Sequence, residues 1–163
     1  MIDLADHIFI SEFHSTGIYK CRVLYRETIE RIELRAYQLR PISTIKLVYH
    51  DTIDYSYKYE DRSMLSQLYG QRGDADDILI IKNGLVTDSY YANVAFRKDD
   101  GEWISPVTPL LKGTKRQLLI DSGLIRSKVI SVEEIPQFTE VSLFNSMIEL
   151  GEIRVPIQEL LES

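Results

Sequence analysis

The chain has 163 residues, enough for one domain with a hydrophobic core and too few for two domains of ordinary size. A hydrophobic content of 44%, a charged content of 27% and a net charge of −6 are typical of a globular protein and argue against a basic nucleic-acid-binding face. No apolar run is long enough to span a membrane, and nothing at the N-terminus resembles a signal peptide, because Asp3 and Asp6 interrupt the only candidate stretch, so we expect a cytoplasmic protein.

The first forty residues carry two patterns. Apolar residues recur at helical spacing over residues 2–14, which predicts a short amphipathic helix. Residues 18–26 and 29–38 alternate apolar and polar side chains, and this alternation predicts the two strands of a hairpin. Cys21 lies in the first alternating run and has no second cysteine to pair with, so we expect it to be a small buried hydrophobe.

A strand and a helix are expected next. Pro41 interrupts the hairpin pattern, and the apolar run at residues 44–49 predicts a new strand. Asp61 is a natural N-cap for a helix that Gly70 and Gly73 are placed to end. The predicted apolar side of this helix consists of Met64, Leu65 and Leu68.

A hairpin signal follows the helix. Residues 78–81 form a short apolar strand, and Asn83 and Gly84 come directly after it. This pair predicts a tight turn, because both residues tolerate positive φ. The return strand delivers Asp88, and residues 93–96 are expected to continue the same sheet.

The second half of the chain alternates strands with short helices. Residues 113–123 are predicted to be a loop that opens a helix, and the N–H groups at such a start can hold a phosphate, although every helix has them. Residues 128–132 and 140–144 are predicted strands, and residues 152–161 a strand followed by a helix. The whole pattern indicates a mixed α+β fold.

Lys58 is the first candidate for chemistry. Tyr55, Tyr57 and Tyr59 flank it, and such an aromatic setting could desolvate an amine and lower its pKa, as a Schiff-base nucleophile requires. The same tyrosines could instead be strand residues that face a core, and most lysines are solvated surface charges. Composition alone favours this second interpretation.

Two other kinds of site are not expected. The three histidines, His7, His14 and His50, are dispersed, with neither metal-ligand spacing nor a nearby cysteine pair, so we expect no metal site. A Ser-His-Asp hydrolase is unsupported because the chain contains no Gly-x-Ser-x-Gly elbow.

Four segments together resemble the class IV aminotransferase family. They are residues 58–62 (KYEDR), 77–96 (DILIIKNGLVTDSYYANVAF), 103–106 (WISP) and 109–116 (PLLKGTKR), and they occur in the family's order. That family depends on pyridoxal 5'-phosphate and includes branched-chain and D-amino acid aminotransferases and 4-amino-4-deoxychorismate lyase. The resemblance implies the C-terminal domain of the D-amino acid aminotransferase-like fold, a twisted mixed β-sheet or pseudo-barrel with flanking helices.

The resemblance also implies a cofactor site. Lys58 would form the Schiff base with pyridoxal phosphate and then move a proton as acid and base. Asp88 stands where the family usually has glutamate, paired with the pyridine nitrogen, and it is one methylene shorter. The charge relation is retained, because a nearby carboxylate favours the protonated ring.

Further residues are implied around the phosphate and the ring. Arg62 falls near the position that approaches the ring oxygen of the cofactor, with a surface charge at a helix start as its alternative. The phosphate would be held by backbone donors of the glycine loop and by a strand end, which correspond to Gly113, Thr114, Lys115, Asn145 and Ser146.

The same resemblance predicts the organisation of the chain. Residues 1–40 are expected to be a remnant of the family's small N-terminal domain, and residues 41–163 the cofactor-binding domain. Family members carry further residues before the matched region, so we expect either a naturally shortened member with a remodelled cleft or a remnant whose start has been lost. Family enzymes are generally homodimers with the site near the subunit boundary, so we expect a homodimer, in which a partner could close the cleft of a shortened member.

Two functions follow from these expectations. The first is a pyridoxal-phosphate-dependent enzyme that acts on an amino acid or an aminodeoxychorismate-like small molecule. It is expected to be more lyase-like than transaminase-like, because residues 145–147 (NSM) are similar to the lyase branch. The alternative is a catalytically inactive homologue that keeps the fold as a binding or structural module, as the shortened start and Asp88 suggest.

Overall fold

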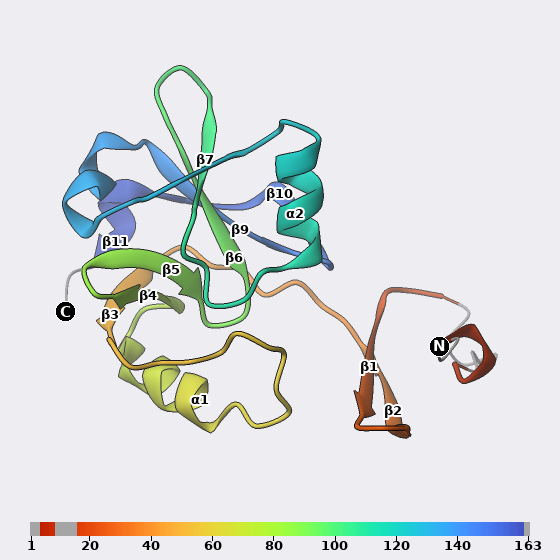
Figure 1. Ribbon diagram of the computed structural model, residues 1–163. Coiled ribbons are helices and arrows are strands. Elements are labelled where there is room, and N and C mark those ends of the chain that lie inside the picture. Colours follow the sequence, from red (N-terminus) through yellow and green to blue (C-terminus); the bar gives the residue numbers. More distant parts are fainter. Residues whose placement is uncertain (1–3, 9–15, 162–163) are drawn as a thin grey trace. The chain divides into compact units, whose positions relative to one another are not determined.

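The computed structural model describes residues 4–8 and 16–161. The chain divides into two compact units, Met1–Arg40 and Pro41–Ser163. Figure 1 labels the elements of each unit. The interpretation of the first unit as a remnant of a smaller domain stays a prediction.

The first unit contains the predicted hairpin. Strands β1 (Tyr19–Tyr25) and β2 (Ile29–Ala36) are antiparallel, which confirms the alternation pattern. Cys21 is exposed, so its expected burial is wrong. The alternation predicted the strand but not which of its two faces is buried. The buried residue of β1 is Leu24, which lies on the face opposite to Cys21.

Most of the predicted N-terminal helix over residues 2–14 lies outside the described residues. Within the part that is described, Leu4–Asp6 forms a 3-10 turn, η1.

The second unit contains a four-stranded sheet in the order β11-β3-β4-β5. Strands β3 (Ile45–Tyr49) and β4 (Asp77–Lys82) are parallel, and β11 (Leu160–Leu161) pairs in parallel with β3. Strand β5 (Leu85–Ser89) returns antiparallel to β4. The turn between β4 and β5 has φ of 52° at Asn83 and 74° at Gly84, so the predicted hairpin is confirmed.

A second, five-stranded sheet has the order β10-β9-β6-β7-β8. Its strands are β6 (Asn93–Arg97), β7 (Trp103–Pro106), β8 (Arg126–Lys128), β9 (Glu140–Asn145) and β10 (Ile148–Pro156). The expectation that residues 93–96 continue the first sheet is therefore wrong. Both β5 and β6 are buried along almost their whole length, and such a strand carries no pattern that shows which sheet it joins.

Helix α1 (Ser63–Tyr69) packs on the first sheet (Figure 1). Its Leu65 and Leu68 join a core cluster with apolar residues of β3 and β4. The expected apolar side is thus confirmed for these two residues and wrong for Met64, which is 42% exposed. The N-cap is Arg62, one residue after the predicted Asp61, although the Asp61 carboxylate accepts the backbone N–H of Ser63 at 2.8 Å.

Helix α2 (Thr114–Asp121) packs on the second sheet (Figure 1). Its Leu119 contacts a cluster with Ala95 of β6 and Phe144 of β9. The predicted helix and its C-terminal stop are confirmed, and Gly123 has a φ of 73°.

Several boundaries differ from the expectations. The strand predicted at residues 128–132 is wrong beyond Lys128, because β8 ends at that residue and η4 (Val132–Gln137) begins at residue 132. A short 3-10 turn, η3 (Gly70–Arg72), extends α1. The predicted C-terminal helix is wrong beyond η5 (Ile157–Glu159), because β11 pairs with β3 there. In the described part of the chain, no helix is long and apolar enough to cross a membrane.

Candidate active site

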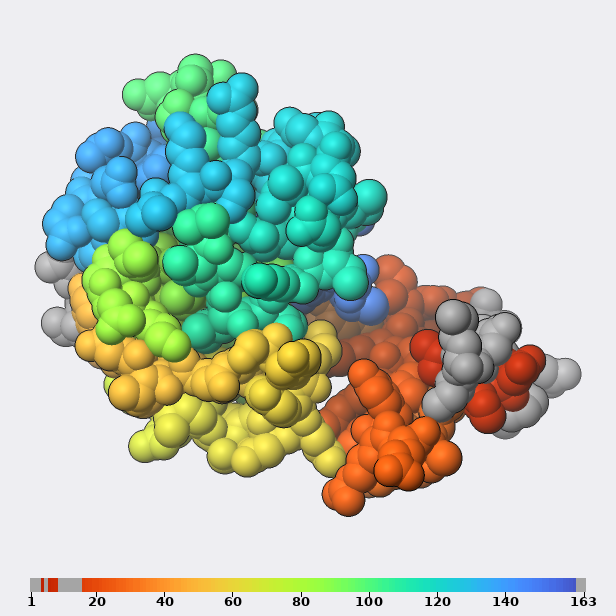
Figure 2. All heavy atoms as spheres, viewed as in Figure 1, coloured from red at the N-terminus to blue at the C-terminus, as the bar shows by residue number. Residues whose placement is uncertain are grey.

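A cavity of about 300 Å³ opens in the second unit. It is lined by residues 55–65, the bend between β5 and β6, residues 110–115 at the start of α2, and the turn between β9 and β10. The space-filling view shows the first and third of these segments, gold and teal, meeting at the surface (Figure 2). All the predicted site residues line this cavity: Lys58, Arg62, Asp88, Gly113, Thr114, Lys115, Asn145 and Ser146. Their chemical roles stay predictions.

A β-bulge directs Asp88 into the cavity. The pairing of β4 with β5 shifts between Leu79 and Ile81, so that Thr87 and Asp88 together lie opposite Ile80. A bulge interrupts the alternation of side chains between the two faces of a strand. Thr87 and Asp88 are both buried, at 2% and 5% exposure, and Asp88 lines the cavity. The Thr87 hydroxyl donates to the Ile80 carbonyl at 2.7 Å, which satisfies a backbone acceptor at the bulge.

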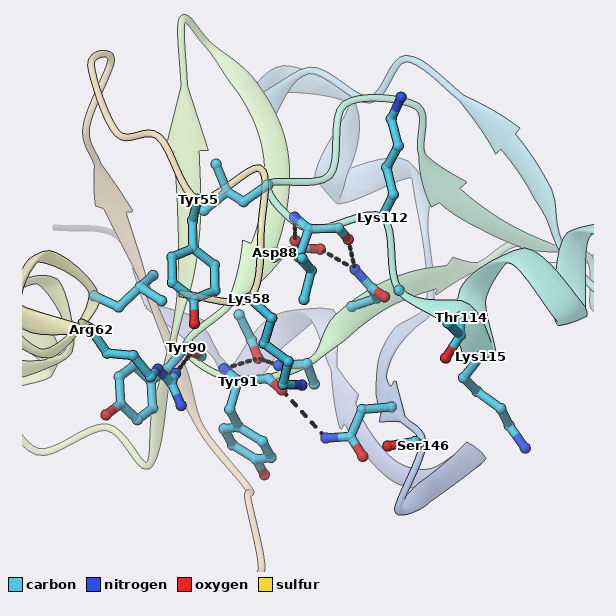
Figure 3. A pocket seen from close by; sticks show the side chains of 18 residues that line it. Tyr55, Lys58, Arg62, Asp88, Tyr90, Tyr91, Lys112, Thr114, Lys115 and Ser146 are labelled. Carbon is cyan, nitrogen blue, oxygen red and sulfur yellow. Dashed lines mark hydrogen bonds between the residues drawn. The ribbon is translucent and has the colours of Figure 1, made fainter. Parts of the chain in front are cut away.

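The carboxylate of Asp88 is held by two donors (Figure 3). Its Oδ1 accepts a hydrogen bond from Asn93 Nδ2 at 2.8 Å, and its Oδ2 accepts one from the Leu111 backbone N–H at 2.9 Å. Burial raises the pKa of Asp88 to about 6, and these donors and the nearby Arg116 charge oppose that rise. At neutral pH the Asp88 carboxylate is therefore mostly ionised, although burial makes the ionised form costly in free energy.

Asn93, which donates to the Asp88 carboxylate, also lies in close contact with Gly113. Asn93 Nδ2 also donates to the Leu111 carbonyl at 2.8 Å, so one amide group contacts both Asp88 and the segment before α2. A Cβ added to Gly113 would collide with Asn93 Oδ1. Because the φ of Gly113 is −66°, which any residue adopts, the close approach and not the backbone conformation requires glycine here.

Arg116 is a buried residue of the site region to which the sequence analysis gave no role. It is 6% exposed and donates to Ser105 Oγ at 3.0 Å, the Pro106 carbonyl at 2.6 Å and Ser127 Oγ at 2.8 Å. These bonds attach α2 to β7 and β8. The signal for it was the arginine of the Gly-x-x-Arg segment, three residues after Gly113.

Lys58 lies in an exposed loop at the edge of the cavity. The Tyr55 hydroxyl donates to the Tyr59 carbonyl at 3.1 Å, which closes the loop around the lysine. Tyr57 and Tyr59 are 72% and 45% exposed, so these two tyrosines form neither the desolvating setting nor the core-facing strand of the two interpretations, whereas Tyr55 packs against the core cluster of α1, β3 and β4. Figure 3 shows Lys58 in the same cavity as Asp88, with Lys112 and Lys115 pointing away from it.

Arg62 is half-buried and attached to the bend between β5 and β6. Its guanidinium donates to the Tyr90 carbonyl at 2.6 Å and lies 4.6 Å from the centre of the Tyr90 ring. That ring stacks on Tyr69 with centroids 4.4 Å apart. Arg62 therefore holds the bend in place while it lines the cavity, and it is not the solvated surface charge of the alternative interpretation.

The start of α2 presents backbone donors to the cavity. Gly113 is the N-cap and no side chain caps the helix, so the N–H groups of Thr114 and Lys115 have no partner within it. The Lys115 side chain points outward and pairs with Glu149 at 2.6 Å (Figure 3). The backbone of Lys115 is therefore the part of this residue that can serve the cavity.

The turn between β9 and β10 completes the lining. Asn145 Nδ2 donates to the Tyr91 carbonyl at 3.3 Å, and its Oδ1 accepts the Met147 backbone N–H at 2.8 Å. Ser146 is exposed at the cavity. The amide of Asn145 is thus engaged in fixing the turn, and the Ser146 hydroxyl remains to contact a ligand.

Some lining residues were not predicted as site residues. They include Leu65 of α1, Tyr90 and Tyr91 of the bend, and Leu110 to Lys112 before α2. For all of them except Leu65, a position close to Asp88 or Gly113 in sequence was the available signal. The family resemblance placed both segments at one cofactor, but it did not identify these neighbours as lining residues.

Comparison with known proteins identifies the family. Residues 56–155 match the amino-transferase class IV family. An uncharacterized protein of Haemophilus influenzae is 41% identical over 130 residues, which are 80% of this chain and 69% of that protein. The chain therefore belongs to the class IV aminotransferase family.

Solved structures agree with this assignment. A provisionally assigned 4-amino-4-deoxychorismate lyase from Haemophilus somnus is 37% identical, with a TM-score of 0.77 over 82% of this chain and 69% of that one. The PLP-bound form of a hypothetical aminotransferase from Mycobacterium tuberculosis has a TM-score of 0.63 over 79% of this chain and 53% of that one, at 14% identity. The second likeness shows the fold alone. The mixed fold expected from the family resemblance is confirmed.

The close approach of Gly113 to Asn93 predicts an asymmetry between two glycines. Gly113→Ala is expected to lower the free energy of unfolding by about 2 kcal/mol, because the added methyl collides with a buried amide. Gly70→Ala is the matched control, since its φ is −60° and a Cβ there meets nothing within 4 Å. Urea unfolding measures the free energy of unfolding of both variants. Equal values for Gly113→Ala and Gly70→Ala would contradict the close contact between Gly113 and Asn93.

Burial of Asp88 predicts a pH dependence of stability in the cofactor-free protein. Because the folded-state pKa is raised from 3.8 to about 6, its contribution is fully present below pH 3.8 and is lost as the pH rises through 6. Relative to Asp88→Asn, the wild type is expected to lose about 2 kcal/mol of unfolding free energy between pH 4.5 and pH 7. Urea unfolding across this range measures it, and a constant difference between the two proteins would rule the assignment out.

Proposed function

We propose that the protein is a pyridoxal-phosphate-dependent enzyme whose cofactor binds in this cavity, attached to Lys58. The observation that carries the proposal is the content of the cavity: an accessible lysine, a buried carboxylate and a helix start without a side-chain cap. These groups match the aldehyde, the ring nitrogen and the phosphate of the cofactor in chemical type. The cofactor-binding role of residues 41–163 is part of this proposal.

The Asp88 carboxylate fits the pyridine nitrogen. A carboxylate that is buried and raised in pKa gains most from a positive partner, and a protonated ring nitrogen is such a partner. Each carboxylate oxygen has two lone pairs, and the donors from Asn93 and Leu111 occupy one on each. A lone pair therefore remains for a donor in the cavity, which supports aspartate in the place of the family's usual glutamate.

The start of α2 fits the phosphate. The N–H groups of Thr114 and Lys115 carry the partial positive charge of a helix N-terminus, where anions bind favourably. The hydroxyls of Thr114 and Ser146 add donors from two separate segments that line the same cavity. Glycine at position 113 allows the chain to pass close to Asn93 at this point.

The chain's own residues divide the chemical work. When bound, pyridoxal phosphate supplies an electron sink for the electron pair of the bond that breaks. Lys58 Nζ would hold the cofactor and then take up and return the proton at the reacting carbon. Asp88 would keep the ring nitrogen protonated, and Arg62, fixed on Tyr90, would support the wall beside the ring.

The proposed reaction is that of a lyase acting on 4-amino-4-deoxychorismate or a similar small molecule, with amino acid transamination second. Support comes from residues 145–147, similar to the lyase branch, and from the 37% identity to the Haemophilus somnus protein. The cytoplasmic location and the homodimer that the family resemblance implies belong to this proposal and stay predictions.

After addition of pyridoxal phosphate and removal of the free cofactor by gel filtration, the protein is expected to keep an absorbance band near the edge of the visible range. Lys58→Ala should abolish this protein-bound band, because the side chains of Lys112 and Lys115 point away from the cavity (Figure 3). Lys128→Ala is the matched control, since Lys128 is an exposed residue of β8 that does not line the cavity. Absence of a band in the wild type at saturating cofactor would remove the proposal and leave a non-catalytic homologue.

The reaction class is tested by product analysis. With cofactor and 4-amino-4-deoxychorismate, we expect release of pyruvate that depends on Lys58 and falls at least 100-fold in Lys58→Ala. Parallel incubation of branched-chain and D-amino acids with 2-oxoglutarate measures transamination. Transamination without pyruvate release would reverse the order of the two reactions.

A further inference from the structure

We propose that Asn93 is a positioning residue that fixes the Asp88 carboxylate and couples it to the segment carrying the phosphate donors of α2. This inference rests on the proposed function of the cavity, and it concerns a residue that contacts neither the aldehyde nor the phosphate in that proposal.

The geometry is a closed set of hydrogen bonds. Asn93 Nδ2 donates to Asp88 Oδ1 and to the Leu111 carbonyl, both at 2.8 Å, and the Leu111 N–H donates to Asp88 Oδ2 at 2.9 Å. The Asp88 carboxylate, the Asn93 amide and the Leu111 peptide therefore hold one another (Figure 3). Rotation of the carboxylate about its χ2 angle would break two of these bonds.

The contact with Gly113 extends this set to the helix. Asn93 Oδ1 occupies the space in which any side chain at position 113 would begin. Gly113 is the N-cap of α2, directly before the Thr114 and Lys115 amides. A shift of the Asn93 amide would therefore move both the Asp88 carboxylate and the start of α2.

This arrangement compensates for the shorter acid. Aspartate reaches one methylene less than glutamate, so its oxygens must be placed by their surroundings and not by side-chain reach. Two directional donors remove the rotational freedom of the group, and preorganised groups lose less free energy when a partner binds. The buried Arg116 is the other charged group that acts on Asp88, and it is attached separately to β7 and β8.

The experiment is a double-mutant cycle with two readouts. Asn93→Ala is combined with Asp88→Ala, and pyridoxal phosphate affinity is measured by titration of the absorbance band. Asn93→Ala alone is expected to weaken binding about 10-fold, because the Asp88 carboxylate loses one of the donors that position it. In the Asp88→Ala background the same substitution should change affinity less than 2-fold, because its target is gone.

The second readout needs no cofactor. Removing the Asn93 donor takes away a hydrogen bond to the ionised form of Asp88, so the pH midpoint of the stability difference described above should move upward. Asn93→Ser, whose hydroxyl is too short to reach, repeats the measurement if the alanine variant does not fold. Ser142→Ala is the control, because it removes a buried hydrogen bond of β9, from the Gly151 backbone N–H at 2.8 Å, and Ser142 does not line the cavity.

The outcomes separate the two proposals. If the wild type binds no cofactor, the proposed function fails, and the cofactor-free midpoint still decides whether Asn93 positions Asp88. If the wild type binds and Asn93→Ala weakens binding equally with and without Asp88, the coupling is wrong while the function stands. A midpoint that does not move in either Asn93 variant would also overturn the inference.

Discussion

The site depends on keeping the almost fully buried carboxylate of Asp88 ionised. Desolvation opposes its charge, and two donors and the charge of Arg116 offset that cost. Both donors come from parts of the chain beyond β5, one from the first residue of β6 and one from the segment before α2. The crossing from the first sheet to the second, directly after Asp88, is therefore what makes the buried charge tolerable.

This crossing also explains why the cavity lies where it does. Each sheet has its own helix and its own core cluster, α1 on the first and α2 on the second. The polar groups that lie between these two layers need hydrogen-bond partners there, because neither apolar core provides them. Ser89, for example, accepts the Ala92 backbone N–H at 3.1 Å through its hydroxyl oxygen and closes the bend that joins the layers. The cavity therefore lies where these two apolar layers meet.

The sequence predicted the parts of this structure that are encoded locally. The Asn83-Gly84 turn, the helix after Gly113 and the hairpin of the first unit depend on residues close together in the chain, and all three are confirmed. The site residues were found through a family resemblance, because their spacing alone resembles ordinary surface and core positions. Long-range pairing was not predictable from alternation, and the sheet assignment of β6 was accordingly wrong.

The missed features share a physical cause. The bulge at Thr87 and Asp88 exists only in relation to Ile80 on the partner strand, and the role of Asn93 exists only in relation to Leu111 and Gly113. Exposure of Lys58 likewise follows from the path of its loop and not from the tyrosines beside it. A property that depends on a partner residue distant in the sequence can be assigned only once the fold is known.

The bulge has a consequence for the tolerance of the chain to insertions and deletions. Side chains along a strand alternate between faces, so a slip of one residue reverses the direction in which each of them points. The pairing of β5 is set at the Asn83-Gly84 turn, where Lys82 lies opposite Leu85, and only Val86 separates Leu85 from Thr87 and Asp88. Adding or removing one residue at that exposed turn would therefore displace Asp88 from the cavity, although the turn itself contacts no part of it. The length of the turn is thus constrained as strictly as the identity of the acid.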